Sequence, residues 1–165
     1  MSGLGMPFFN SVPETFSQLR QAITETKFGV TVGGLELGQT TDAIAMSAAG
    51  VLRNNGYEVS LVILSNIQAI YDRHPSIANA KAIRKASLDW MLENGILVND
   101  VTSFKDGMNV PLDPIAIQRY QVFAHEVPLF FTKVDNTIGV RQFLMGRRHD
   151  SGTIISHGAE LRFYQ

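Results

Sequence analysis

The sequence predicts an α+β fold: a single domain in which helices pack on a mixed sheet, ending in an antiparallel C-terminal strand meander. Helical spacing of apolar residues dominates the earlier part of the chain, whereas alternating strand patterns dominate its end. The 165 residues contain no internal repeat and no low-complexity linker, and this length suits one hydrophobic core. We therefore expect one domain over residues 13–165, preceded by an apolar arm over residues 1–12.

The predicted helices show apolar residues every three or four positions and capping residues at their ends. One of them starts at Thr40 or Thr41 and ends at the turn residues 54–56. Small residues on one of its faces, including Gly50, would let a second element approach closely. Further helices are predicted from Pro13 onward, at 67–71, at 76–94 with Gly95 as the stop, and at 115–120.

The strongest strand pattern covers residues 57–64, whose second half is apolar on both faces and therefore suits the centre of a sheet. A hairpin with a Gly-Gly turn is predicted at 28–37, and a short strand at 96–101. The predicted meander consists of antiparallel strands at 122–132, 138–145 and 153–164, of which the last two pair directly. The residues expected to be nearly fully buried are Leu61, Ile63, Ile83 and Trp90.

Composition argues against several classes of function. The net charge of −1 gives no reason to expect nucleic acid or an anionic membrane as a partner. No apolar stretch approaches the ~20 residues of a membrane-spanning helix, and no secretory signal is visible. The absence of cysteine excludes a disulfide scaffold and a thiolate metal site. No metal or cofactor is predicted.

The N-terminal arm, MSGLGMPFFNSV, has neither a helical nor a strand period. Phe8 and Phe9 follow Pro7, which keeps the segment extended, and burying each phenylalanine stabilises by roughly 2 kcal/mol. One interpretation is a loose tail. The other, which we predict, is an arm that places Phe8 and Phe9 in a groove of this chain or of a neighbour and supports self-association.

The turn at 146–152 holds the best candidates for contact with an anion. Arg147 and Arg148 lie between glycines and can hold a phosphate or a carboxylate through bidentate hydrogen bonds, with His149 beside them. The alternative is a hairpin end kept soluble by its charge, or a salt bridge between subunits. His149 and His157 can meet across the last hairpin beside Asp150, but we expect two surface histidines without a metal.

No catalytic constellation is visible, so no catalytic residue is predicted. The glycines at 33–38 precede a helix but lack the Lys-Ser/Thr pair of a phosphate loop. The sequence favours a non-enzymatic structural subunit of a ring, tube or connector, of virus-tail or secretion-machine type. Such a subunit would form homo-oligomers and bind other proteins of its assembly, in the cytoplasm or in a virion, through Phe8, Phe9, Arg147 and Arg148. The alternative is a small enzyme or ligand-binding domain whose anion site contains Arg147, Arg148 and His149.

Overall fold

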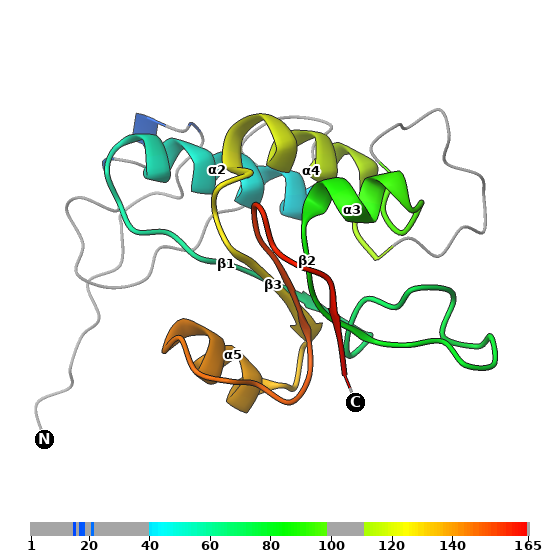
Figure 1. Cartoon of the computed structure of the whole chain (residues 1–165). Helices are drawn as coiled ribbons and strands as arrows, with labels where there is room; N and C mark the ends of the chain where they lie inside the picture. The colour runs from blue at the N-terminus through cyan, green and yellow to red at the C-terminus, as the bar shows by residue number, and fades with distance from the viewer. Residues whose placement is uncertain (1–14, 16, 19–20, 22–39, 99–110, 165) are drawn as a thin grey trace, which may run out of the picture.

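The computed structural model describes residues 15, 17–18, 21, 40–98 and 111–164. Within them a five-stranded sheet lies between two helical layers (Figure 1). Helices α2 (Thr41–Asn54), α3 (Leu88–Glu93) and α4 (Pro114–Arg119) cover one face, and α5 (Thr137–Leu144) lies on the other. Helix α4 continues into a π-helical turn, η2 (Tyr120–Ala124).

The sheet has the order β1-β3-β4-β2-β5. Its strands are β1 (Leu61–Ser65), β2 (Ile83–Ala86), β3 (Leu129–Lys133), β4 (Thr153–Ile155) and β5 (Arg162–Phe163). The pairs β1–β3 and β2–β4 are parallel, whereas β3–β4 and β2–β5 are antiparallel. The predicted α+β class, with one domain and a mixed sheet, is therefore confirmed.

Local capping signals placed two helix ends correctly. The Thr40 side chain accepts a hydrogen bond from the Ala43 amide at the start of α2, as predicted. Gly95, with φ +66°, closes the turn after α3, also as predicted. The structure adds a third cap, Asp113, immediately before Pro114 at the start of α4. At Gly50 the close approach predicted from the small residues is present, because an added Cβ would collide with the backbone carbonyl of Phe123 in η2.

The single long helix predicted at 76–94 is wrong. Residues 83–86 form β2, and only Leu88–Glu93 is helical, with Ser87 as its N-cap. Asn79 has φ +67°, a left-handed conformation that interrupts a right-handed helix at this point. The short helix predicted at 67–71 is also absent; Tyr71 instead forms an isolated bridge with Ala82.

The predicted meander is correct only in part. Strand β3 pairs antiparallel with β4, but residues 137–144 between them form helix α5, so the direct pairing of 138–145 with 153–164 is wrong. Asn136 caps α5 by accepting from the Gly139 amide, and Gly146 follows the helix with φ +64°. Asn and Gly also mark turns between strands, so these signals fit both structures.

The core lies between the sheet and the three-helix layer. Ile83 is fully buried, Leu61 is 7% exposed and Ile63 6%, as predicted, whereas Trp90 is only half-buried and packs against the core. Strand β1 is shorter than predicted, and Leu64 is 53% exposed, so its second half is not covered on both faces. Among the described strands β1 pairs with β3 only. The predicted hairpin at 28–37 and the arm at 1–12 lie outside the described residues.

Candidate functional site

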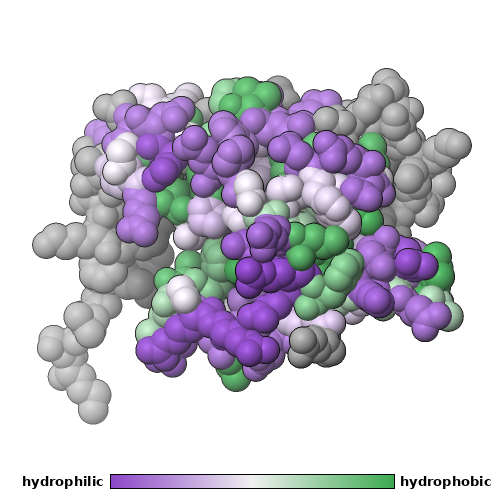
Figure 2. All heavy atoms as spheres, viewed as in Figure 1, coloured by the Kyte–Doolittle hydropathy of each residue, from purple (hydrophilic) through white to green (hydrophobic). Residues whose placement is uncertain are grey.

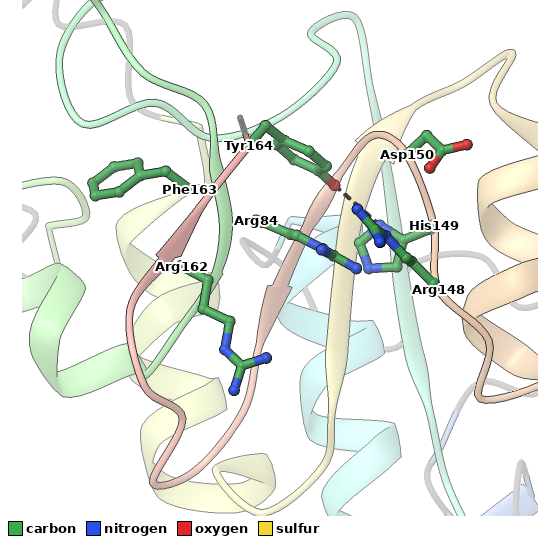
Figure 3. Close-up of a pocket in the computed structure, with 7 residues that line it drawn as sticks. All are labelled: Arg84, Arg148, His149, Asp150, Arg162, Phe163 and Tyr164. Atoms are coloured by element: carbon green, nitrogen blue, oxygen red, sulfur yellow. Dashed lines mark hydrogen bonds between the residues drawn. The ribbon is translucent and has the colours of Figure 1, made fainter.

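A polar cavity of about 670 Å³ opens where β2 and β5 meet the turn that precedes β4 (Figure 3). We call it the arginine pocket, because three guanidinium groups line it together with one carboxylate. Figure 2 shows the same face coloured by hydropathy: strongly hydrophilic residues, in purple, lie below the helical layer beside a hydrophobic area in green. The lining residues are Arg84 from β2, Arg148, His149 and Asp150 from the turn, Arg162 and Phe163 from β5, and Tyr164 directly after β5.

The turn that carries Arg148 is held in place from both sides. Asn136, the cap of α5, donates hydrogen bonds to the hydroxyl oxygens of Thr132 (2.7 Å) and Ser151 (2.8 Å). Gly152 has φ +91°, and an added Cβ there would collide with the ring of Phe130, so this position requires glycine. The turn is therefore fixed by β3 and α5 rather than by a hairpin.

His149 is buried at 2% exposure and forms one wall of the pocket. Its Nδ1 lies 2.9 Å from the Ser151 carbonyl oxygen and 3.0 Å from the Tyr164 hydroxyl. Because the Tyr164 hydroxyl donates to the Gly152 carbonyl at 2.6 Å, we assign the Nδ1 proton to the bond with Ser151. Burial lowers the pKa of His149, and the nearby Arg84 charge lowers it further, so the neutral ring is favoured.

Tyr164 links this wall to Arg84. The guanidinium carbon of Arg84 lies 6.0 Å from the centre of the Tyr164 ring, within the range of a cation–π contact. Burial raises the pKa of Tyr164 to about 12, so its hydroxyl stays protonated at neutral pH. With cations on three elements and one carboxylate among the lining residues, the pocket can chemically accept an anion.

The structure separates the residues that the sequence placed together. Arg148 and His149 line the pocket, whereas the exposed Arg147 is not one of its lining residues. His149 and His157 do not meet; the ring of His157 instead lies 5.7 Å from that of His125, edge to face. Phe8 and Phe9 lie outside the described residues.

Sequence reasoning missed Arg84, Arg162 and Tyr164. Arg84 falls within residues 76–94, for which the sequence predicts one long helix, but it lies on β2. The signal that could have found these residues is the pairing of β2 with β5, which brings Arg162 opposite Lys85. That pairing joins distant segments and leaves no local pattern in the sequence.

A second polar feature lies at the N-termini of α2 and α4. Asp42 stands in the first turn of α2, and burial together with the charge of Asp113 raises the pKa of its carboxyl. Asp113 accepts hydrogen bonds at one oxygen, Oδ1, from the amides of Ile115 and Ala116. The charge of Asp113 thus acts on the Asp42 carboxyl here. Within the described residues no group of three or more His, Cys, Asp or Glu side chains is placed to hold a metal ion.

The sequence is similar to those of two uridylate kinases. No protein-family model matches the sequence. The chain is 32% identical over 120 residues to the uridylate kinase of Methanopyrus kandleri, a match that covers 70% of this chain and 49% of the relative. It is 29% identical over 116 residues to the uridylate kinase of Methanosarcina mazei, covering 70% of this chain and 46% of the relative. The chain thus spans about half the length of the curated relatives it matches.

The fold of this chain is similar to that of solved UMP kinase structures. The uridylate kinase of Archaeoglobus fulgidus matches with a TM-score of 0.66 at 19% identity, over 90% of this chain and 61% of that one. The UMP kinase of Bacillus anthracis matches with a TM-score of 0.63 at 16% identity, over 90% of this chain and 54% of that one. The chain therefore has the fold of UMP kinases.

These findings overturn the functional prediction. The relatives and structural neighbours are uridylate kinases, which are enzymes, so the predicted non-enzymatic subunit of a virus tail or secretion machine is wrong. The sequence contains no motif that we can assign to a reaction, and this lack is not evidence against an enzyme. The part of the chain that the structure describes contains no helix long and apolar enough to cross a membrane.

Proposed function

We propose that this chain is a nucleotide-binding phosphotransferase domain of uridylate-kinase type, which takes part in transfer of a phosphoryl group from a nucleoside triphosphate to UMP. The observation that carries the proposal is the 32% identity over 120 residues to a uridylate kinase. The shared fold supports it. It replaces the structural-subunit interpretation and agrees in class with the alternative of a small enzyme with an anion site.

The pair Asp42 and Asp113 is the best candidate for phosphoryl-transfer chemistry. In this class of reaction the protein positions the phosphates, and Mg²⁺ neutralises the charge that develops on them. Mg²⁺ in such sites is bound by one or two carboxylates together with substrate phosphates. Asp42 and Asp113 offer this donor set, because α2 and α4 pack against each other and the charge of Asp113 adds to burial in raising the pKa of the Asp42 carboxyl. They are the residues that would hold the ion.

The experiment is a coupled assay of ADP formation from ATP and UMP, with Asp42→Asn and Asp113→Asn compared with the unmodified chain. Asparagine keeps an oxygen that can cap a helix, so the variants remove charge without removing the cap. We expect each to lower kcat/KM at least about tenfold with little change in Tm. Asp89→Asn, in the first turn of α3, is the matched control and is expected to retain activity. Full activity in both variants, or no UMP-dependent ADP formation by the unmodified chain, would contradict the proposal.

We also infer that the chain self-associates, as its near-zero net charge predicts. A group of apolar side chains around α5 supports this: Ile138 is 71% exposed, Leu144 59% and Met145 50%. Sedimentation velocity of the unmodified chain and of Leu144→Lys tests it, and equal sedimentation of both as monomers would refute it. The roles of Phe8 and Phe9 in association stay predictions.

A further inference from the structure

We propose that the arginine pocket binds a phosphate-class dianion, either inorganic phosphate or the phosphoryl group of a nucleotide. The residues that bind it are Arg84, Arg148 and Arg162. This assignment rests on the geometry of the pocket. It does not require the phosphotransferase activity proposed above, and it concerns residues other than Asp42 and Asp113.

The first argument is uncompensated charge. Within the described residues, neither Arg84 nor Arg148 forms an ion pair, and Arg162 pairs only with Glu160, at 3.6 Å on an exposed surface. The single carboxylate of the lining, Asp150, points away from the guanidinium groups in Figure 3. Like charges that share a cavity repel each other, and a bound anion would replace that repulsion with charge-assisted hydrogen bonds.

The second argument is that Arg84 is held before any ligand arrives. Its guanidinium group lies against the ring of Tyr164, whose hydroxyl donates to the Gly152 carbonyl and lies 3.0 Å from His149 Nδ1. Tyr164 is thus fixed by the same turn that presents Arg148. Less conformational freedom is then lost on binding, which increases affinity.

The third argument concerns the shape of the ligand. The three guanidinium groups come from different elements: Arg84 from β2, Arg148 from the turn before β4 and Arg162 from β5 (Figure 3). Planar guanidinium groups on separate elements suit a tetrahedral anion, whose oxygens accept hydrogen bonds from several directions. A carboxylate offers two oxygens in one plane and one negative charge. The cavity of about 670 Å³ also leaves space for more than a single phosphate group.

The test is isothermal titration calorimetry of the full chain at fixed ionic strength with inorganic phosphate, UMP and ATP in separate arms, and acetate as the singly charged comparison. Arg148→Gln removes a lining guanidinium group, and Arg147→Gln removes the neighbouring one that does not line the pocket. We expect saturable 1:1 binding of at least one phosphate ligand, weakened about tenfold to a hundredfold by Arg148→Gln and less than about twofold by Arg147→Gln. Acetate is expected to bind at least about tenfold more weakly.

The outcomes separate the sources of the ligand and the two proposals. Comparable affinities for inorganic phosphate and UMP would support a free-phosphate site, and binding of the nucleotides alone would support a nucleotide phosphoryl site. No saturable binding of any phosphate ligand, or equal losses in the two arginine variants, would overturn the assignment. The chain could bind phosphate in a manner that depends on Arg148 and yet form no ADP that depends on UMP. That result would support the phosphate site and refute the proposed kinase function.

Discussion

Thr153 connects three segments around the arginine pocket, and its hydroxyl offers a sharp test of how they are held. The side chain is fully buried at the start of β4. Its Oγ1 donates to the Ile83 carbonyl at 2.7 Å and accepts from the Ile70 amide at 2.8 Å. Thr153→Val keeps the shape but removes both hydrogen bonds, and so takes a partner from each of two buried backbone groups.

The magnitude follows from those two bonds. A buried polar group left without a partner costs about 1–3 kcal/mol, so Thr153→Val, which leaves two, should lower the free energy of unfolding by about 2–6 kcal/mol. This is a large share of the ~5–15 kcal/mol typical of a domain. Thr153→Ser keeps the hydroxyl and loses one methyl group, for which we expect about 1 kcal/mol.

Urea unfolding followed by the fluorescence of Trp90, the one tryptophan of the chain, measures both variants. A Thr153→Val variant within about 0.5 kcal/mol of the parent would refute the reasoning, because this is the range of ordinary surface substitutions. Equal losses for Val and Ser would also refute it, since the hydroxyl would then not be the stabilising group.

Two further predictions concern packing and pH. Gly50→Ala should destabilise the fold by about 1–3 kcal/mol, although alanine has the better helix propensity, because the added Cβ collides with the Phe123 carbonyl. Urea unfolding measures this change, and a gain in stability would show that η2 does not lie against α2. Because the pKa of His149 is lowered in the folded state, the unfolded chain binds a proton at this histidine at a higher pH than the folded chain does. The free energy of unfolding should therefore decrease as the pH falls below 6.5, the ordinary pKa of histidine. Unfolding measured between pH 7.5 and about 5 should show a weaker decrease in His149→Asn, and an unchanged slope would exclude His149 as the source.

The sequence predicted those parts of the fold that depend on residues close together in the chain, and it did not predict those that depend on pairing between distant segments. Thr40, Asp113 and Gly95 act within a few residues of the helix ends that they define, so α2, the start of α4 and the end of α3 were predictable. Residues 83–86 form a strand because they pair with β4 and β5, and that tertiary pairing overrides the helical spacing read from 76–94.

The same division applies to the site. Arg148 and His149 were found because two arginines beside a glycine turn form a local pattern for anion contact. Arg84 and Arg162 reach the pocket only through the β2–β5 pairing, and Tyr164 through its hydrogen bond to Gly152. The carboxylates Asp42 and Asp113 come together because α2 and α4 pack side by side, and each alone was visible only as a helix-terminal residue.

The most direct test of the proposed phosphotransferase function is product analysis by ³¹P nuclear magnetic resonance. The unmodified chain is incubated with ATP, UMP and Mg²⁺, and with ATP and Mg²⁺ alone. We predict UDP and ADP in equal amounts in the first mixture and neither product in the second, because the phosphoryl group lost by ATP is transferred to UMP. ATP left intact in both mixtures, or ADP formed with inorganic phosphate and no UDP, would contradict it.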